Sequence, residues 1–237
     1  KAAAIEAPAD PPLRDPSQWR YIGKSVPRTD IPAKTNGTAE FAIDVKQEGM
    51  LHATVKMSPR FGAGIKSSDT GKAEAMPGVE KIIKLDSLNS MNPKNTLTNG
   101  FAVIANNTWR AFKAADAIEV EWETASYPAD TAGIMKTYED SFAKEPNGTF
   151  DEKGDIELFF ADAGDQIQAE YRVPHLAHST MEPMTAVAQV KDGRIDIWTG
   201  AQSPTGTRDA IMEAAGVEAD NVHIHTTYLG GGFGRRS

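Results

Sequence analysis

The 237-residue sequence contains no cysteine. A chain without thiols forms no disulfide, holds no iron–sulfur cluster through its own side chains and has no cysteine nucleophile. Any redox centre must therefore be brought by a cofactor or by a partner protein.

Long apolar runs and an excess of positive charge are also missing. No stretch approaches the roughly 18 apolar residues that a membrane-spanning helix requires. The net charge of −8 argues against electrostatic binding of nucleic acid. Apolar and charged contents of 40% and 24% are typical of globular proteins. Because the sequence begins with Lys1, the lack of a signal peptide is uninformative.

The first half of the chain alternates strand and helix patterns after a lead-in. Residues 1–20 are rich in Ala, Pro and Asp and are predicted to be an extended lead-in. Leu51, Ala53, Val55 and Met57 alternate with polar residues, which predicts a half-buried strand. The same domain, residues 21–150, should contain further strands at 79–85, 101–105 and 118–122, a helix over 70–76 capped by Asp69, and a helix over 108–115 capped by Thr108.

A second domain is predicted over residues 151–237, after a boundary near 150–165 where the pattern is weak. Its clearest signal is Asp192-Gly193 between two apolar runs, because this dipeptide suits a tight hairpin turn. A helix should begin at Ser203-Pro204 and stop at Gly216. A last strand, from Val222, runs into a cluster of glycines.

The glycine cluster Gly230, Gly231, Gly232 and Gly234 indicates an anion-binding loop. Without a Cβ the backbone can adopt left-handed conformations, and its N–H groups can approach a phosphate, an oxyanion or a large anionic cofactor. Neither common nucleotide motif fits, because Arg235 stands where a Walker A loop needs lysine and where a dinucleotide fingerprint needs its third glycine. A β-bulge or tight turn, with purely structural glycines, is the alternative.

Two groups of histidines are also candidate sites. His175, His178 and Glu182 are metal-ligand types, but nearby prolines discourage a single helix, so we expect hydrogen-bonded loop histidines and no metal site. His223 and His225 share one strand face, where we expect solvation. No carboxylate pair is singled out as an acid/base couple, so no catalytic residue is named.

Gln202 lies between a strand end and a helix start, in Trp198-Thr199-Gly200-Ala201-Gln202-Ser203-Pro204. Its amide offers a donor and an acceptor beside helix N–H groups that favour anions. An ordinary turn glutamine is the alternative interpretation.

Taken in order, several segments resemble the molybdenum-binding subunit of the xanthine dehydrogenase and aldehyde oxidase family, particularly isoquinoline oxidoreductase beta subunits. The resemblance implies an α+β fold, with an α/β hammerhead-like domain followed by the beginning of a molybdopterin-binding α+β domain. It also implies that the chain is a fragment, inactive by itself. The matching segments are residues 23–41, 49–53, 76–79, 181–183, 198–204 and 230–236.

The same resemblance implies roles for individual residues. Gln202 matches the glutamine beside the molybdenum centre, and Gly232, Phe233 and Gly234 match the loop that contacts the pterin of a molybdopterin-type cofactor. The family's catalytic glutamate belongs to a later segment, so no catalytic residue is expected here. Arg235-Arg236-Ser237 replaces the Gly-Lys-Glu of purine-oxidising members, which argues against a purine substrate.

The implied reaction is oxidative hydroxylation of an aromatic N-heterocycle or an aldehyde, with water as the oxygen source. Iron–sulfur clusters would lie on a small cysteine-rich partner subunit. Two alternatives stay open: a non-catalytic binding or assembly module, and a nucleotide-binding protein. The location is open between the periplasm or cell envelope, which the resemblance suggests, and the cytoplasm.

Overall fold

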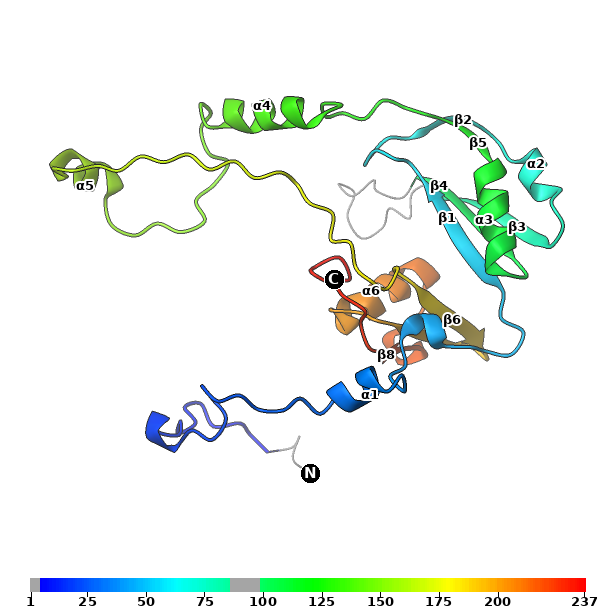
Figure 1. Ribbon diagram of the computed structural model, residues 1–237, viewed down its shortest axis with the longest axis horizontal. Coiled ribbons are helices and arrows are strands. Elements are labelled where there is room, and N and C mark those ends of the chain that lie inside the picture. The colour runs from blue at the N-terminus through cyan, green and yellow to red at the C-terminus, as the bar shows by residue number, and fades with distance from the viewer. Residues whose placement is uncertain (1–4, 86–98) are drawn as a thin grey trace. The chain divides into compact units, whose positions relative to one another are not determined.

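A computed structural model describes residues 5–85 and 99–237 (Figure 1). The first four residues of the predicted lead-in therefore lie outside the described part. The chain divides into two compact units, Lys1–Glu40 and Phe41–Ser237. A domain boundary within the second unit, near residues 150–165, stays a prediction.

The first unit is organised by local contacts. It contains a short 3₁₀ turn, η2 (Pro16–Gln18), and one helical turn, α1 (Ile31–Thr35). Asp30 pairs with Arg28 at 2.5 Å and with Lys34 at 2.6 Å. No residue described between positions 5 and 40 is buried, so this unit has no core of its own.

The second unit opens with an antiparallel sheet in the order β1-β4-β3. These strands span His52–Met57 (β1), Val79–Leu85 (β3) and Gly100–Ala105 (β4), and the helices α2 (Gly71–Glu74) and α3 (Thr108–Ala117) pack against them (Figure 1). The predicted strands and helices of this region are confirmed to within a few residues, except that the N-cap of α2 is Thr70 and not Asp69. The buried core consists of Ala73, Phe101, Val103, Ala114, Ala115 and Ile118.

Strand β1 is half-buried, as predicted, but its apolar side chains lie on the exposed face. Val55 is 55% exposed, and Leu51 and Met57 are also exposed, whereas the polar side chains between them are half-buried. The polar face is the one that meets α3 and its C-terminal end, where Lys56 Nζ donates to the Ile118 carbonyl oxygen at 2.6 Å. Alternation defines two faces of a strand, but the position of the helix decides which face is covered.

The cap of α3 is also corrected. Asn107, not Thr108, is the N-cap, and its side-chain oxygen accepts from the Arg110 N–H at 2.9 Å. The helix buries Ala111, Ala114 and Ala115, while Trp109 and Phe112 are exposed on another face. Small residues allow α3 to approach the sheet closely, so the aromatic pair does not form the packing face.

A two-stranded antiparallel sheet joins β2 (Ile65–Asp69) to β5 (Glu119–Trp122). Glu119 and Glu121 are exposed and Val120 and Trp122 half-buried, so β5 has one face toward solvent. Strand β2 was not predicted, because Ile65-Lys66-Ser67-Ser68-Asp69 lacks apolar alternation.

Two helices missed by sequence reasoning lie between residues 124 and 165. They are α4 (Thr131–Ser141) and α5 (Ile156–Asp162), and neither buries a residue. Each begins after an aspartate whose side chain accepts a backbone N–H: Asp130 from Gly133 at 2.7 Å and Asp155 from Leu158 at 3.0 Å. Those N-caps were the available sequence signal.

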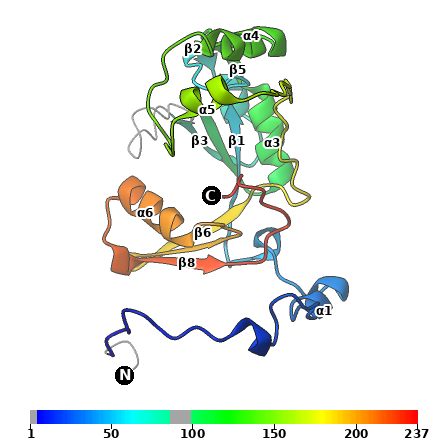
Figure 2. The ribbon, with the colours of Figure 1, turned by 90° about the vertical axis from the view of Figure 1, so that its left-hand side faces the viewer.

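The last sheet has the order β6-β7-β8, formed by Ala186–Lys191, Arg194–Thr199 and Val222–Thr226. The hairpin turn is confirmed, with φ of 51° at Asp192 and 78° at Gly193. Strands β7 and β8 are parallel and are connected through α6 (Pro204–Ala215), which packs near β8 (Figure 2). Gly216 ends α6 at φ 66°, as predicted.

The mixture of helices and largely antiparallel sheets confirms the α+β fold class. Within the described ranges, every helix is too short or too polar to cross a lipid bilayer.

Candidate functional site

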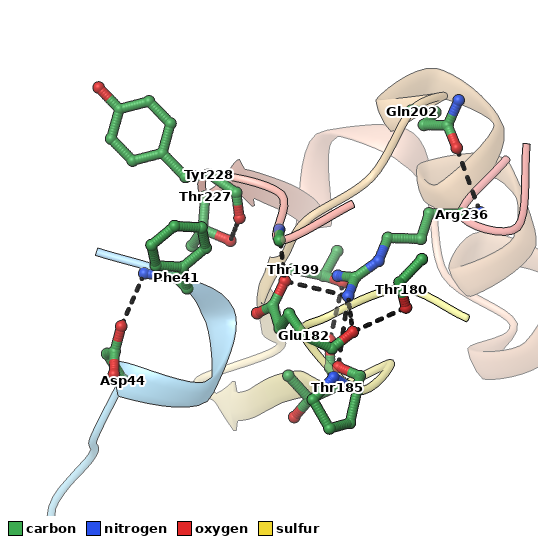
Figure 3. Close-up of polar contacts among 12 residues, drawn as sticks. Phe41, Asp44, Thr180, Glu182, Thr185, Thr199, Gln202, Thr227, Tyr228 and Arg236 are labelled. Atoms are coloured by element: carbon green, nitrogen blue, oxygen red, sulfur yellow. Dashed lines mark hydrogen bonds and ion pairs between the residues drawn. The ribbon is translucent and has the colours of Figure 1, made fainter. Parts of the chain in front are cut away.

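The glycine loop, defined here as Gly230–Arg236, lies beyond the C-terminal end of β8. Parallel strands bring their carboxyl ends to one edge of a sheet, so the residues after β7 and after β8 meet there. The Thr227 N–H donates to the Thr199 carbonyl at 3.2 Å and continues this pairing past the strand. Figure 3 shows Gln202, Glu182 and Arg236 gathered at this edge.

Gln202 is attached to the glycine loop at three points. Its backbone N–H donates to the Arg236 carbonyl at 2.9 Å. Its side-chain Oε1 accepts from the N–H of Gly234 at 2.9 Å and from that of Arg236 at 3.4 Å. Its Nε2 has no partner among the described residues, and the side chain is exposed. The amide therefore presents its donor outward, because the loop holds its acceptor.

Glu182 is buried and contacts the other side of the loop. The Glu182 and Gly230 backbones meet, with the Glu182 N–H donating to the Gly230 carbonyl at 3.0 Å. Glu182 Oε2 accepts from the Gly230 N–H at 2.9 Å and pairs with Arg236 Nη2 at 3.0 Å (Figure 3). The same Nη2 donates to the carbonyls of Glu182 at 2.8 Å and Pro183 at 3.3 Å. Sequence reasoning considered Glu182 as a candidate metal ligand and as part of a matching motif, and it missed both this anchor and the buried Arg236.

The glycines of the loop serve different purposes. A Cβ at Gly230 would collide with the Cβ of Glu182, and one at Gly232 would lie 2.5 Å from Gln202 Oε1. Gly231 and Gly234 have φ of 107° and 92°, which side-chain-bearing residues rarely adopt. Gly234 faces open space. Two glycines thus permit close packing within the protein, and two permit the turn.

Three consecutive N–H groups, those of Gly231, Gly232 and Phe233, have no hydrogen-bond partner among the described residues. Phe233 itself has φ 54° and a side chain that is 74% exposed. Successive free amides in a turn of this kind form a concave site with partial positive charge. The loop, with Gln202 Nε2 beside it, can therefore bind an anionic or oxygen-rich group.

The histidines lie elsewhere. The expected solvation of His225 is confirmed, since its side chain is 42% exposed; its ring also stacks on Trp198 with centroids 4.8 Å apart, and its Nε2 lies 2.6 Å from Asp196 Oδ1. The pKa of Asp196 is held well below its ordinary value by hydrogen bonds from Arg194 and then from His225. His175 contacts the Tyr138 hydroxyl at 2.8 Å. Residues 5–85 and 99–237 contain no group of three metal-ligating side chains.

Residues 141–237 match the molybdopterin cofactor-binding domain family. The chain is 32% identical to the membrane-bound aldehyde dehydrogenase (pyrroloquinoline-quinone) of Gluconacetobacter polyoxogenes, over 95% of this chain and 29% of that protein. It is 30% identical to the isoquinoline 1-oxidoreductase subunit beta of Brevundimonas diminuta, over 94% of this chain and 28% of that protein.

Among solved structures, quinoline 2-oxidoreductase from Pseudomonas putida 86 matches with a TM-score of 0.66 and 22% identity, over 90% of this chain and 31% of that one. This likeness shows a shared fold. The resemblance seen in the sequence motifs is confirmed: the chain is similar to one region of the molybdenum-binding subunits of aldehyde and isoquinoline oxidoreductases and xanthine dehydrogenases. It spans under a third of the length of the curated relatives described above.

Proposed function

We propose that this chain forms part of the cofactor site of a molybdenum hydroxylase large subunit, with Gln202, Gly232, Phe233 and Gly234 as cofactor-binding residues. One observation carries the proposal. The Gln202 amide, with its Nε2 free, lies beside three consecutive free N–H groups on the glycine loop. The match of residues 141–237 to the molybdopterin cofactor-binding domain supports it.

The four residues would contact a molybdopterin-type cofactor through different atoms. The N–H groups of Gly232 and Phe233 would donate to the pterin, and Gln202 Nε2 would donate to an oxygen or sulfur beside the molybdenum. The N–H of Gly234 is already donated to Gln202, so Gly234 would act through its open Cα side, where a ligand can approach the backbone closely.

When bound, a molybdopterin-type cofactor supplies oxidative hydroxylation, with water as the oxygen source. The substrate would be an aldehyde or an aromatic N-heterocycle, since the relatives' names include aldehyde, isoquinoline and nicotinate enzymes. A partner subunit with iron–sulfur clusters would accept the electrons, in keeping with the relatives that are named as single subunits of isoquinoline and nicotinate enzymes. This chain's own residues would orient the cofactor.

The test is the metal and pterin content of the full-length protein, produced in a host that makes molybdopterin. We expect molybdenum and a fluorescent pterin derivative to be released on denaturation, and much less of both from the Gln202→Ala variant. Absence of molybdenum, while a related molybdenum enzyme made in the same host is loaded, would overturn the proposal.

A second candidate is a binding or assembly module with structural glycines. It is favoured by Gly230 and Gly232, whose missing side chains leave room for Glu182 and Gln202 and not for a ligand. Under this alternative the full-length protein would fold without molybdopterin and would still bind its partner. A nucleotide-binding role would require measurable affinity for ATP or NAD in a titration.

A further inference from the structure

One oxygen atom joins both ends of the glycine loop. Glu182 Oε2 accepts from the backbone N–H of Gly230, the first loop residue, and pairs with the guanidinium of Arg236, the last. The distances are 2.9 Å and 3.0 Å. The carboxylate therefore closes the loop into a ring.

Stability alone does not explain this pair. The side chains of Glu182 and Arg236 are 7% and 3% exposed, so both charges are nearly removed from water. Glu182 Oε1 and Arg236 Nε have no hydrogen-bond partner among the described residues. Incompletely satisfied buried ion pairs are often no more stable than apolar side chains of similar size. What the ion pair adds is directional geometry.

That geometry acts on the three free N–H groups. Gly231, Gly232 and Phe233 lie between the two points that Glu182 joins, and Gln202 holds the adjacent Gly234 from the other side. With both ends fixed, the free N–H groups keep one arrangement before a ligand arrives. Pre-organisation of this kind improves binding by lowering the ordering entropy that binding must overcome.

We propose that Glu182 is a positioning residue that holds the glycine loop in its cofactor-binding conformation, with Arg236 as its counter-ion. The inference rests on the proposed function for the identity of the ligand. It assigns Glu182 and Arg236 no contact with the cofactor.

The experiment compares three variants of the full-length protein. Glu182→Gln keeps the shape but removes the charge, so Arg236 is left buried without an anion. The double variant E182M/R236M replaces the pair by apolar side chains of similar length. Arg235→Gln is the matched control, because it removes a charge from the exposed neighbour of Arg236. Each is measured for thermal midpoint, molybdenum content and amide hydrogen exchange of peptides covering 226–237 in cofactor-free protein.

We expect E182Q to lower the thermal midpoint, to lower molybdenum retention and to speed exchange of the hydrogen-bonded loop amides, those of Gly230, Gly234 and Arg236, about tenfold or more, since the carboxylate that joins the two ends of the loop is lost. E182M/R236M should recover the thermal midpoint but not retention or slow exchange. R235Q should keep wild-type exchange in the loop.

Full recovery of retention and slow exchange in the double variant would overturn the proposal, because apolar packing would then suffice. Unchanged exchange in E182Q would also overturn it. A wild-type protein without molybdenum is a different result: it overturns the proposed function, and the exchange rates alone then decide whether Glu182 closes the loop.

Discussion

The β1-β4-β3 sheet and the β6-β7-β8 sheet are stabilised in different ways. The first packs with α2 and α3 around an apolar core that includes Phe101, Val103 and Ile118. The second supports a loop whose contacts are mainly polar, through Gln202 and a buried carboxylate–guanidinium pair. Apolar packing holds the first region, and directional hydrogen bonds shape the second.

This difference shows which interactions fix a precise arrangement of atoms. Burial of apolar area is non-directional, so a core tolerates changes that keep its volume. Hydrogen bonds and ion pairs require particular atoms at particular distances. A loop that must present free N–H groups in one arrangement therefore depends on a few polar side chains.

The largest effect is expected in the apolar core. Phe101 is 2% exposed, and Phe101→Ala should lower the free energy of unfolding by about 3–5 kcal/mol through lost burial and the cavity left behind. Urea unfolding followed by tryptophan fluorescence measures this loss. Glu80→Gln, on an exposed position of β3, should change it by less than about 0.5 kcal/mol. Equal effects would mean that this core does not dominate stability.

The next largest effect is expected at Gly230, the first residue of the glycine loop. Gly230→Ala should be destabilising by about 1–3 kcal/mol, because the new methyl group would collide with Glu182. At Gly148 a new methyl group would have no atom within 4 Å and the backbone has no left-handed φ, so Gly148→Ala is the control. A G230A protein as stable as G148A would contradict the close approach of Glu182 to the loop.

Removing the Gln202 side chain should have a smaller effect on stability. Gln202→Ala leaves the Gly234 and Arg236 N–H groups without their acceptor, a loss of about 0.5–1.5 kcal/mol per hydrogen bond, less where water replaces it. Thermal unfolding measures it, with exposed Gln168→Ala as the control. An unchanged exchange rate at Gly234 would show that this contact does not form in solution.

The hairpin between β6 and β7 offers a test of local backbone strain at a position away from the candidate site. Gly193 has φ 78°, so Gly193→Ala should lower stability by about 1 kcal/mol through backbone strain. Gly193→Asn should lose less, because asparagine tolerates this conformation. The comparison of thermal midpoints separates backbone strain from lost packing, since nothing lies within 4 Å of this position.

The smallest effect concerns Asp196 and its dependence on pH. Hydrogen bonds from Arg194 and His225 lower the pKa of Asp196 in the folded protein. The stability that ionised Asp196 adds is therefore fully present above the ordinary aspartate pKa, and it is lost as the pH falls through the lower pKa of the folded protein. Asp196→Asn should therefore be slightly less stable than the parent at neutral pH. The difference should shrink as the pH is lowered below about 4. A constant difference across pH would contradict the ionised pairing.

Local chemistry accounts for what could be predicted from sequence. The turn at Asp192-Gly193, the stop at Gly216 and the strand over 101–105 depend on residues within a few positions of one another. The same kind of signal, an aspartate N-cap, was present before α4 and α5. The motif resemblance identified the cofactor-binding region before any contact was known, and the roles of Gln202, Gly232, Phe233 and Gly234 stay predictions.

The amino-acid sequence by itself determined most strands, the helices α2, α3 and α6, and the glycine loop as an anion-binding candidate, because each follows from local backbone preferences and alternation; the α+β class followed from the motif resemblance. Tertiary structure alone decided which face of β1 is covered, and that Glu182 meets Gly230 and Arg236 across 48 and 54 positions of sequence. Contacts over such separations depend on how the sheet brings its strand ends together, and no local pattern encodes that arrangement.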